Sequence, residues 1–362
     1  SWRSRLDPRN STKGAPMSTM TDIRIEEVRY EDMPDDAFAP LNDLQNAKLA
    51  EEHPDDLPRP LAHTIAEIRS IPSLIVVRDF WVWSNDGALI ANAYGYWPTT
   101  EENRHLVRAE LYVRNDHRRR GIGMALLGRL ADVAEDEGRT TLMAVTSDRM
   151  PSGEPFARRV GAEPKLATHN NRLTLADVDR GLLSRWVSEG PGRAPGYSLN
   201  WVERPFGDEV IEEMVDLMGV MNTAPRDDLD MEDERHTAEE IRQRDEALAA
   251  ERYEMWYLVA RHDATGELVG YTEVSWTPFR PDVVYQGDTG VRPEHRGRAL
   301  GKWLKAAMAQ RIIAERPDAR CISTGNADSN DAMLGINQAM GFKPHLAAMW
   351  WNLDVAIRHV NA

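Results

Sequence analysis

The sequence repeats itself once, at an interval of about 178 residues. Three residues of the first copy recur at an offset of 178: Val113, Arg118 and Gly123 become Val291, Arg296 and Gly301. Upstream, GALIANAYGYW from Gly87 resembles GELVGYTEVSW from Gly266, and downstream FARRVGA resembles NQAMGF. A solenoid repeats every 20–50 residues or so. The longer interval therefore predicts one domain fold that is used twice.

The repeat sets the expected domain boundaries. We predict an N-terminal domain over residues 21–178, a linker over 179–197 and a C-terminal domain over 198–362. The segment SEGPGRAPGYS, residues 188–198, is rich in glycine and proline, which is typical of linkers and surface crossings. Residues 1–20 precede the first strand pattern and are expected to be a tag that takes no part in the fold.

Each copy carries a mixed α/β pattern. Residues 21–30 and 197–205 alternate as first strands, and polar helical segments follow at 40–52, 61–70, 208–222 and 237–251. Turn residues at 84–87 and 263–266 predict hairpins. Next come a strand, an Arg/Gly loop and a helix in each copy. A further strand follows, at 140–145 and 319–324, and then a short helix that ends at Gly161 or Gly341. Closing strands are expected at 172–175 and 350–353.

Composition excludes several classes of protein. No run of 18 apolar residues is present, so no membrane span is expected. A formal charge of −15 argues against general nucleic-acid binding, which needs a basic surface. Cys321 is the only cysteine, which excludes internal disulfides and suits a reducing cytoplasm. The histidines His236, His295 and His345 lack ligand spacing, so no metal is expected.

The Arg/Gly loops, VRNDHRRRGIGMALL at 113–127 and VRPEHRGRALGKWLK at 291–305, predict a phosphate site. Each follows a strand and opens a helix, whose free N–H groups and dipole attract anions. Gly121 and Gly123 allow close approach of the backbone to a ligand. In the second copy Gly297 lies two positions ahead of Ala299, which takes the place of the first glycine. The N–H donors would survive this change if Ala299 had a negative φ.

Two commoner phosphate loops do not fit. The P-loop requires Ser or Thr after its Gly-Lys pair, but Gly301-Lys302 is followed by Trp303. The dinucleotide fingerprint requires a third glycine where the sequence has Leu126. A solvated basic turn is the remaining alternative, and recurrence of the loop in the same context weighs against it.

The pattern R-x-x-G-x-G after a strand resembles the pyrophosphate loop of the GNAT superfamily, the acyl-CoA-dependent N-acetyltransferases. RRRGIG at 118–123 matches fully and RGRALG at 296–301 nearly so. A later family signature resembles NDAMLGINQAMGF at 330–342, with Met333 in place of Ala and Asn337 in place of Tyr. The resemblance covers nearly the whole chain after Thr21. It implies two tandem domains, each with a mostly antiparallel central sheet flanked by helices.

The resemblance implies that acetyl-CoA lies between the fourth and fifth strands of a copy, with its pyrophosphate on the Arg/Gly loop. The residues assigned to the cofactor on this basis are Val113, Arg118, Arg119, Arg120, Gly121, Ile122, Gly123 and Met124 in the first copy, and Val291, Arg296, Gly297, Arg298, Ala299, Leu300, Gly301, Asn330 and Asn337 in the second. An amine would then attack the thioester. That step needs a base for the ammonium proton and an acid for the departing thiolate.

Four residues are candidates for proton transfer. Tyr285 is a substitute acid, because Asn337 cannot protonate a thiolate, although a core tyrosine is an equally good interpretation. Glu273, Asp288 and Glu110 are candidate bases, and each could instead face solvent. A bulge in the strand would reverse which faces these side chains occupy. The second copy is favoured for chemistry because it keeps the later signature.

The run APRDDLDMEDE, residues 224–234, suggests a cationic acceptor. We expect Asp227, Asp228 and Asp230 to attract such an amine, the alternative being a solvated loop. The sequence thus predicts a cytoplasmic N-acetyltransferase that acts on a small cationic amine. A non-catalytic acyl-CoA sensor and an acetyltransferase of protein lysines or N-termini remain as alternatives. The acceptor and the oligomeric state stay open.

Overall fold

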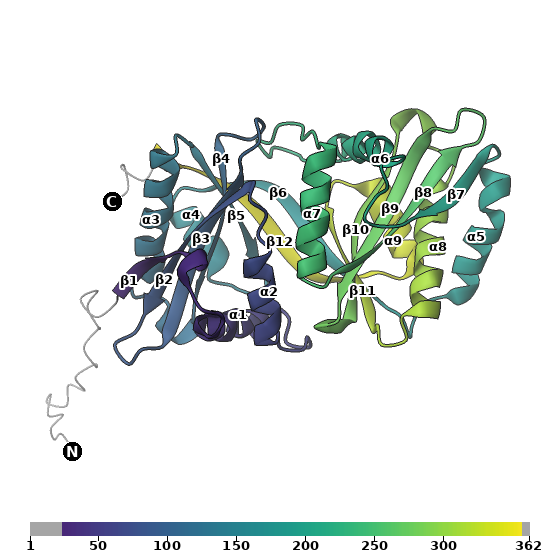
Figure 1. The fold of residues 1–362 in the computed structure, drawn as a ribbon. Helices are drawn as coiled ribbons and strands as arrows, with labels where there is room; N and C mark the ends of the chain where they lie inside the picture. The colour runs from purple at the N-terminus through teal and green to yellow at the C-terminus, as the bar shows by residue number, and fades with distance from the viewer. Residues whose placement is uncertain (1–23, 357–362) are drawn as a thin grey trace, which may run out of the picture.

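The computed structural model describes residues 24–356, so the expected tag lies outside the described residues. The N-terminal half forms the left part of Figure 1. Its elements are β1 (Arg24–Val28), α1 (Ala39–Glu52), α2 (Leu61–Arg69), β2 (Ile75–Trp83), β3 (Leu89–Pro98), β4 (Leu106–Val113), the 3-10 turn η4 (Asn115–His117), α3 (Ile122–Asp136), β5 (Thr141–Ser147), α4 (Gly153–Arg159) and β6 (Glu163–Thr174).

The C-terminal half repeats this order after an additional helix, α5 (Arg180–Arg193). Its elements are β7 (Tyr197–Val202), α6 (Ile211–Met218), the 3-10 turn η5 (Gly219–Thr223), α7 (Ala238–Ala250), β8 (Glu254–His262), β9 (Leu268–Thr277), β10 (Arg280–Val291), the 3-10 turn η6 (Pro293–His295), α8 (Leu300–Glu315), β11 (Cys321–Ala327), α9 (Asp331–Met340) and β12 (Lys343–Asp354). The mixed α/β class and the repeated order of elements are confirmed.

All the strands of residues 24–356 belong to one 12-stranded sheet, in the order β1-β2-β3-β4-β5-β12-β6-β11-β10-β9-β8-β7. The two halves exchange their last strands: β12 runs antiparallel to β5, and β6 runs antiparallel to β11. In Figure 1 the yellow β12 accordingly lies among the blue strands of the first half. Periodicity predicts the strands themselves, but it does not predict this exchange.

The exchange also divides the hydrophobic cores. Leu353 near the end of β12 and Val355 just after it pack among the residues of the N-terminal core. Leu173 of β6 is 1% exposed and packs in the C-terminal core with α8 and β11. Each core is therefore completed by side chains from the other half of the sequence.

The segment expected to link the halves is mostly helical. The Asp179 carboxylate accepts a hydrogen bond from the Leu182 N–H at 2.9 Å and so caps α5. The helix packs on α8 at Gly190, where an added Cβ would lie 2.4 Å from the Trp303 ring. This segment is thus packed against the second core.

A buried ionic cluster joins the halves below the sheet junction. The Asp56 side chain, 2% exposed, lies 2.7 Å from the Arg172 guanidinium of β6 and 2.7 Å from that of Arg280 on β10. Nearby, the rings of His53 and His345 stack with centroids 5.3 Å apart. Burial opposes ionisation of Asp56, but hydrogen bonds from the two arginines lower its pKa to about 2.

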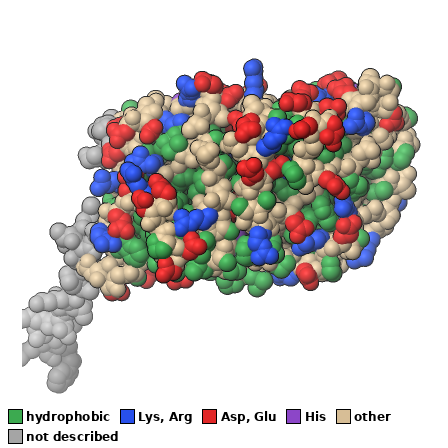
Figure 2. All heavy atoms as spheres, in the orientation of Figure 1, with side chains coloured by type: hydrophobic (Ala, Val, Ile, Leu, Met, Phe, Trp, Pro, Cys, Tyr) green, Lys and Arg blue, Asp and Glu red, His purple; other side chains and the backbone are tan. Residues whose placement is uncertain are grey.

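Charge is mixed on the outer surface. On the face drawn in Figure 2, acidic and basic side chains are interspersed and no broad basic area is present. Within residues 24–356, no helix combines the length and the apolar character needed to cross a bilayer.

Asp56→Ala should lower the free energy of unfolding at pH 7 by about 3–5 kcal/mol, because it leaves two buried guanidinium groups without a counter-charge. Since the pKa of Asp56 is lower in the folded state, its stabilisation is complete above about pH 4 and declines as the pH falls toward 2. Urea unfolding at pH 7 and pH 3 measures both effects. Asp55→Ala, at the exposed neighbour, is the control, and equal stability of the two variants would contradict this role.

Candidate functional site

Each half contains a pair of parallel strands that separate. β4 and β5 pair only over Leu106–Arg108 and Thr141–Met143, although both strands continue beyond these residues. β10 and β11 pair only over Val283–Tyr285 and Cys321–Ser323 before they diverge. The open ends of both pairs lead toward the Arg/Gly loops.

The two Arg/Gly loops have the same backbone conformation. Each has two left-handed positions: Arg119 and Gly121 at φ 62° and 84°, and Gly297 and Ala299 at φ 78° and 61°. Each loop thus places a glycine at only one of its two left-handed positions. Ala299 does not have a negative φ, the condition set for the loss of this glycine, and it adopts nearly the left-handed conformation of Gly121. The N–H groups at the start of α8 keep their orientation at the cost of strain in Ala299.

The outer arginines of each loop bind the loop itself. The Nε–H groups of Arg118 and Arg296 donate to the carbonyls of Val113 and Val291 at 2.8 and 2.9 Å. Arg120 donates to the Asp116 carbonyl at 2.8 Å, and Arg298 donates to the Glu294 carbonyl at 2.9 Å. These bonds fix the loop, so the backbone N–H groups remain as its main donors for an anion.

The last glycine of each loop is needed for helix packing. An added Cβ at Gly123 would lie 3.3 Å from the Phe156 ring of α4, and one at Gly301 would lie 3.4 Å from Ile336 of α9. Both glycines let the helix after the loop approach the short helix that follows the fifth strand. By contrast, an added Cβ at Gly297 would meet no atom within 4 Å, so the outer side of that loop is open.

Only the second half has a bulge beside the separating strands. The pairing of β10 with β9 shifts register between Gln286 and Thr289. The corresponding pairing of β4 with β3 is regular from Arg108 to Val113. Bulges redirect side chains and free backbone groups, and they are enriched next to active sites.

The bulge brings two carboxylates of the second half together. An added Cβ at Gly287 would lie 2.5 Å from Glu273 Oε1, so Glu273 packs directly against the bulge. Asp288 accepts a hydrogen bond from the Tyr271 hydroxyl at 2.9 Å. Burial and the Asp288 charge raise the pKa of Glu273, which is only 6% exposed.

A pocket of about 220 Å³ opens beside Asp288. Pockets for drug-sized ligands measure roughly 300–1,000 Å³, so this one suits a smaller molecule. Its other lining residues come from α6, η5, α7 and the loop between them: Met218, Met221, Asn222, Arg226, Met231, Glu234, His236 and Arg244.

The equivalent place in the first half is filled by its own side chains. Glu110, at the position that corresponds to Asp288, forms an ion pair with the Lys48 ammonium of α1 and accepts a hydrogen bond from Tyr94 at 3.0 Å. Despite the opposing effect of burial, Lys48 lowers the pKa of Glu110. Arg118 pairs with Glu51 at 2.7 Å, whereas Arg296, besides its bond to the Val291 carbonyl, donates to the Thr223 hydroxyl at 2.6 Å.

The model of the acetyltransferase (GNAT) family matches the chain twice, over residues 41–162 and 214–342. The chain belongs to the GNAT acetyltransferase family. The two matches cover the separating strands and the Arg/Gly loop of each half. No curated protein sequence matches the chain.

Solved structures support the tandem GNAT arrangement. A tandem GNAT protein from the clavulanic acid biosynthesis pathway, solved without acetyl-CoA, is 28% identical and has a TM-score of 0.74, covering 92% of this chain and 99% of that chain. A GCN5-related N-acetyltransferase from Sphaerobacter thermophilus is 15% identical with a TM-score of 0.66, covering 93% and 97%. A glucosamine N-acetyltransferase region of a fungal β-N-acetylglucosaminidase is 13% identical with a TM-score of 0.64, covering 94% and 38%. The last two show the fold alone.

Three residues were assigned to the site on the basis of the GNAT signature: Asn330 and Asn337, which belong to it, and Tyr285, the candidate acid in place of its tyrosine. In the structure all three make contacts within the protein. Asn330 caps α9 by accepting a hydrogen bond from the Met333 N–H at 3.2 Å. Asn337 is 1% exposed, and its side-chain N–H donates to Asn326 Oδ1 at 2.7 Å, while its side-chain oxygen has no hydrogen-bond partner. Tyr285 lies at the sheet junction, where burial raises its pKa and the charges of the Asp56 cluster act on it. Tyr285 of β10 pairs with Ser275 of β9, two residues along that strand from Glu273.

The acidic run 224–234 mostly contacts other residues. Asp230 lies 3.2 Å from His105, Glu232 accepts a hydrogen bond from the Asn103 N–H, and Glu234 lies 3.2 Å from Arg108. Asp227 accepts from the Ser329 hydroxyl at 2.6 Å. The run therefore joins the second half to β4 and the loop before it. Asp228 is exposed, and its charge acts on Lys165 of β6.

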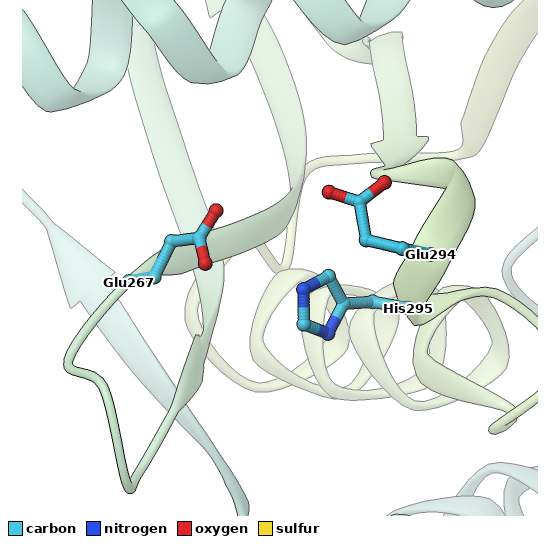
Figure 3. Close-up of side chains that lie close together, drawn as sticks. All are labelled: Glu267, Glu294 and His295. Carbon is cyan, nitrogen blue, oxygen red and sulfur yellow. The ribbon is translucent and has the colours of Figure 1, made fainter.

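A group of ligand-type side chains lies next to the second loop, as Figure 3 shows. Oxygen or nitrogen atoms of Glu267, Glu294 and His295 lie within 4.8 Å of one another. Two of the three are already paired: Glu267 with Arg292 at 3.3 Å, and His295 Nδ1 with the Tyr197 hydroxyl at 2.8 Å. The sequence analysis missed this cluster because Glu267 is distant along the chain. We assign no metal to it.

Ala299→Gly should stabilise the protein by about 0.5–1 kcal/mol, because glycine removes the left-handed strain and this gain exceeds its entropy cost. Ala307→Gly, in the middle of α8, is the matched control and should destabilise by about 1 kcal/mol. Thermal unfolding of both variants provides the measurement. Equal destabilisation of the two would show that the loop is unstrained.

Proposed function

We propose that the protein is an acetyl-CoA-dependent N-acetyltransferase of a small amine, with its chemistry in the C-terminal half. The bulge of β10 supports this assignment most strongly. It lies where β10 leaves β11. Asp288 at the bulge lines the pocket, and Glu273 packs against the bulge at Gly287. The first half has a regular strand there, with Glu110 paired to Lys48.

The second loop fits the pyrophosphate of acetyl-CoA. The outer side of the loop is open at Gly297, and within residues 24–356 no carboxylate pairs with Arg296. In the first half, Glu51 partly neutralises Arg118, which weakens the attraction of that loop for an anion. Acetyl-CoA would supply the activated acyl group in the gap between β10 and β11.

Asp288 and Glu273 would receive the proton of the attacking amine. Asp288 lines the pocket and can hold an incoming ammonium group by charge and hydrogen bonding. Glu273 is buried behind it with a raised pKa, so the pair can hold a proton closer to neutral pH than an exposed glutamate can. Tyr271 fixes Asp288 through its hydroxyl.

Asp288→Asn should lower kcat/KM for the amine by about 100-fold or more, which is typical of the loss of a general base. Release of CoA thiol from acetyl-CoA, measured across a panel of amines, is the assay. Glu110→Gln is the matched control in the other half and should keep activity near that of the wild type. If Glu110→Gln abolished activity and Asp288→Asn did not, the first half would be the catalytic one. Binding of acetyl-CoA without thiol release from any amine would favour the sensor alternative.

The pH dependence of kcat/KM should reflect the raised pKa of Glu273. Activity should fall on acidification at a pH above the ordinary glutamate range, since the pair becomes protonated there. Asp288→Asn removes a charge that raises this pKa, so the residual activity should decline at lower pH than in the wild type. A pH profile of both proteins tests this, and coincident acidic limbs would contradict coupling between the two carboxylates.

A further inference from the structure

The pocket beside Asp288 contains an arginine without a partner. Arg244 of α7 lines this pocket, and its guanidinium has no hydrogen bond or ion pair among residues 24–356. Its neighbours on the helix are both paired, Arg242 with Asp208 at 2.9 Å and Asp245 with Arg204. Burial disfavours the charged form of Arg244, whereas the charges of Glu273 and Asp288 favour it. The pKa of Arg244 is raised overall.

The other charges of the pocket wall are already compensated. Arg226 donates to Asn222 at 2.7 Å and lies 3.1 Å from Asp233, so it holds the loop around the pocket. Glu234 is paired with Arg108 of the first half at 3.2 Å. Arg244 and Asp288 form no ion pair among residues 24–356, and Asp288 accepts a hydrogen bond from Tyr271. These two charged groups of the pocket wall are therefore available to a ligand.

We propose that the acceptor carries a carboxylate as well as an amine, as an amino acid does. This inference rests on the proposed function and names the substrate class of the same site. Asp288 would hold the ammonium group, and Arg244 would bind the carboxylate through its planar fork of N–H donors. A zwitterion offers one charge to each of these two unpaired groups, whereas a purely cationic amine would be repelled by Arg244.

The rest of the lining indicates an apolar side group. Met218, Met221 and Met231 line the pocket, and methionine side chains adapt their shape to apolar ligands. At about 220 Å³ the pocket suits a single amino acid rather than a peptide segment. The acceptor would then be a small zwitterion with an aliphatic or thioether side chain.

The test compares amino acids with amines that lack only the carboxylate, for example L-leucine with 3-methylbutylamine and L-methionine with 3-(methylthio)propylamine. CoA thiol release gives kcat/KM for each member of a pair. Wild type should favour the amino acid by about tenfold to a hundredfold, the range for loss of one charged hydrogen-bonding contact. Arg244→Met should abolish this preference by lowering kcat/KM for the amino acid alone. Arg242→Met, two residues away, is the matched control and should keep the preference.

The outcomes separate this inference from the proposed function. If Asp288→Asn abolishes thiol release but Arg244→Met keeps the preference for the amino acid, only the carboxylate assignment fails. If the wild type uses the amino acid and the matching amine equally well, the carboxylate assignment also fails while the proposed function stands. If no probe reacts, calorimetric titration of the same probes into wild type and Arg244→Met decides. Weaker amino-acid binding in the variant supports the inference, and unchanged or absent binding overturns it.

Discussion

Hydrogen bonds along β12, which runs between β5 and β6, join both halves of the chain into one sheet. This exchange determines the geometry of the site. β6 pairs with β11 over all of Cys321–Ala327, while β10 pairs with only the first three of these residues. Because β11 is held on its other side by a strand of the first half, the gap between β10 and β11 stays open. The gap in the second half thus depends on the first half.

The duplicated fold keeps its backbone and varies its chemistry. Both Arg/Gly loops have the same left-handed positions and the same arginine bonds to loop carbonyls. Around this common frame, Lys48 and Glu51 fill the first site, whereas the second has a bulge, two adjacent carboxylates and an open pocket. Such a division lets one copy act as scaffold while the other is free to bind substrates.

The sequence was sufficient to predict the elements, their repetition and the positions of the Arg/Gly loops, because these depend on local periodicity and glycine placement. It did not reveal the strand exchange, since β6 and β12 have similar patterns and either could close either half. Arg118 and Arg296 were assigned to phosphate, but in the structure their guanidinium groups donate to loop carbonyls. A sequence pattern does not distinguish these two kinds of acceptor. Asp230 was expected to face a substrate, and its pairing with His105 depends on the arrangement of the halves, which no local pattern encodes. Arg244 was not identified, because a lone arginine in a polar helix has no distinguishing spacing.

The claim that the chemistry belongs to the second half is tested most directly by a crystal structure of the protein with acetyl-CoA. The account predicts the acetyl group between β10 and β11, beside the bulge at Gly287 and Asp288, with the pyrophosphate on the loop that begins α8. Acetyl-CoA bound only in the first half, with its acetyl group beside Glu110 and Lys48 displaced, would contradict it.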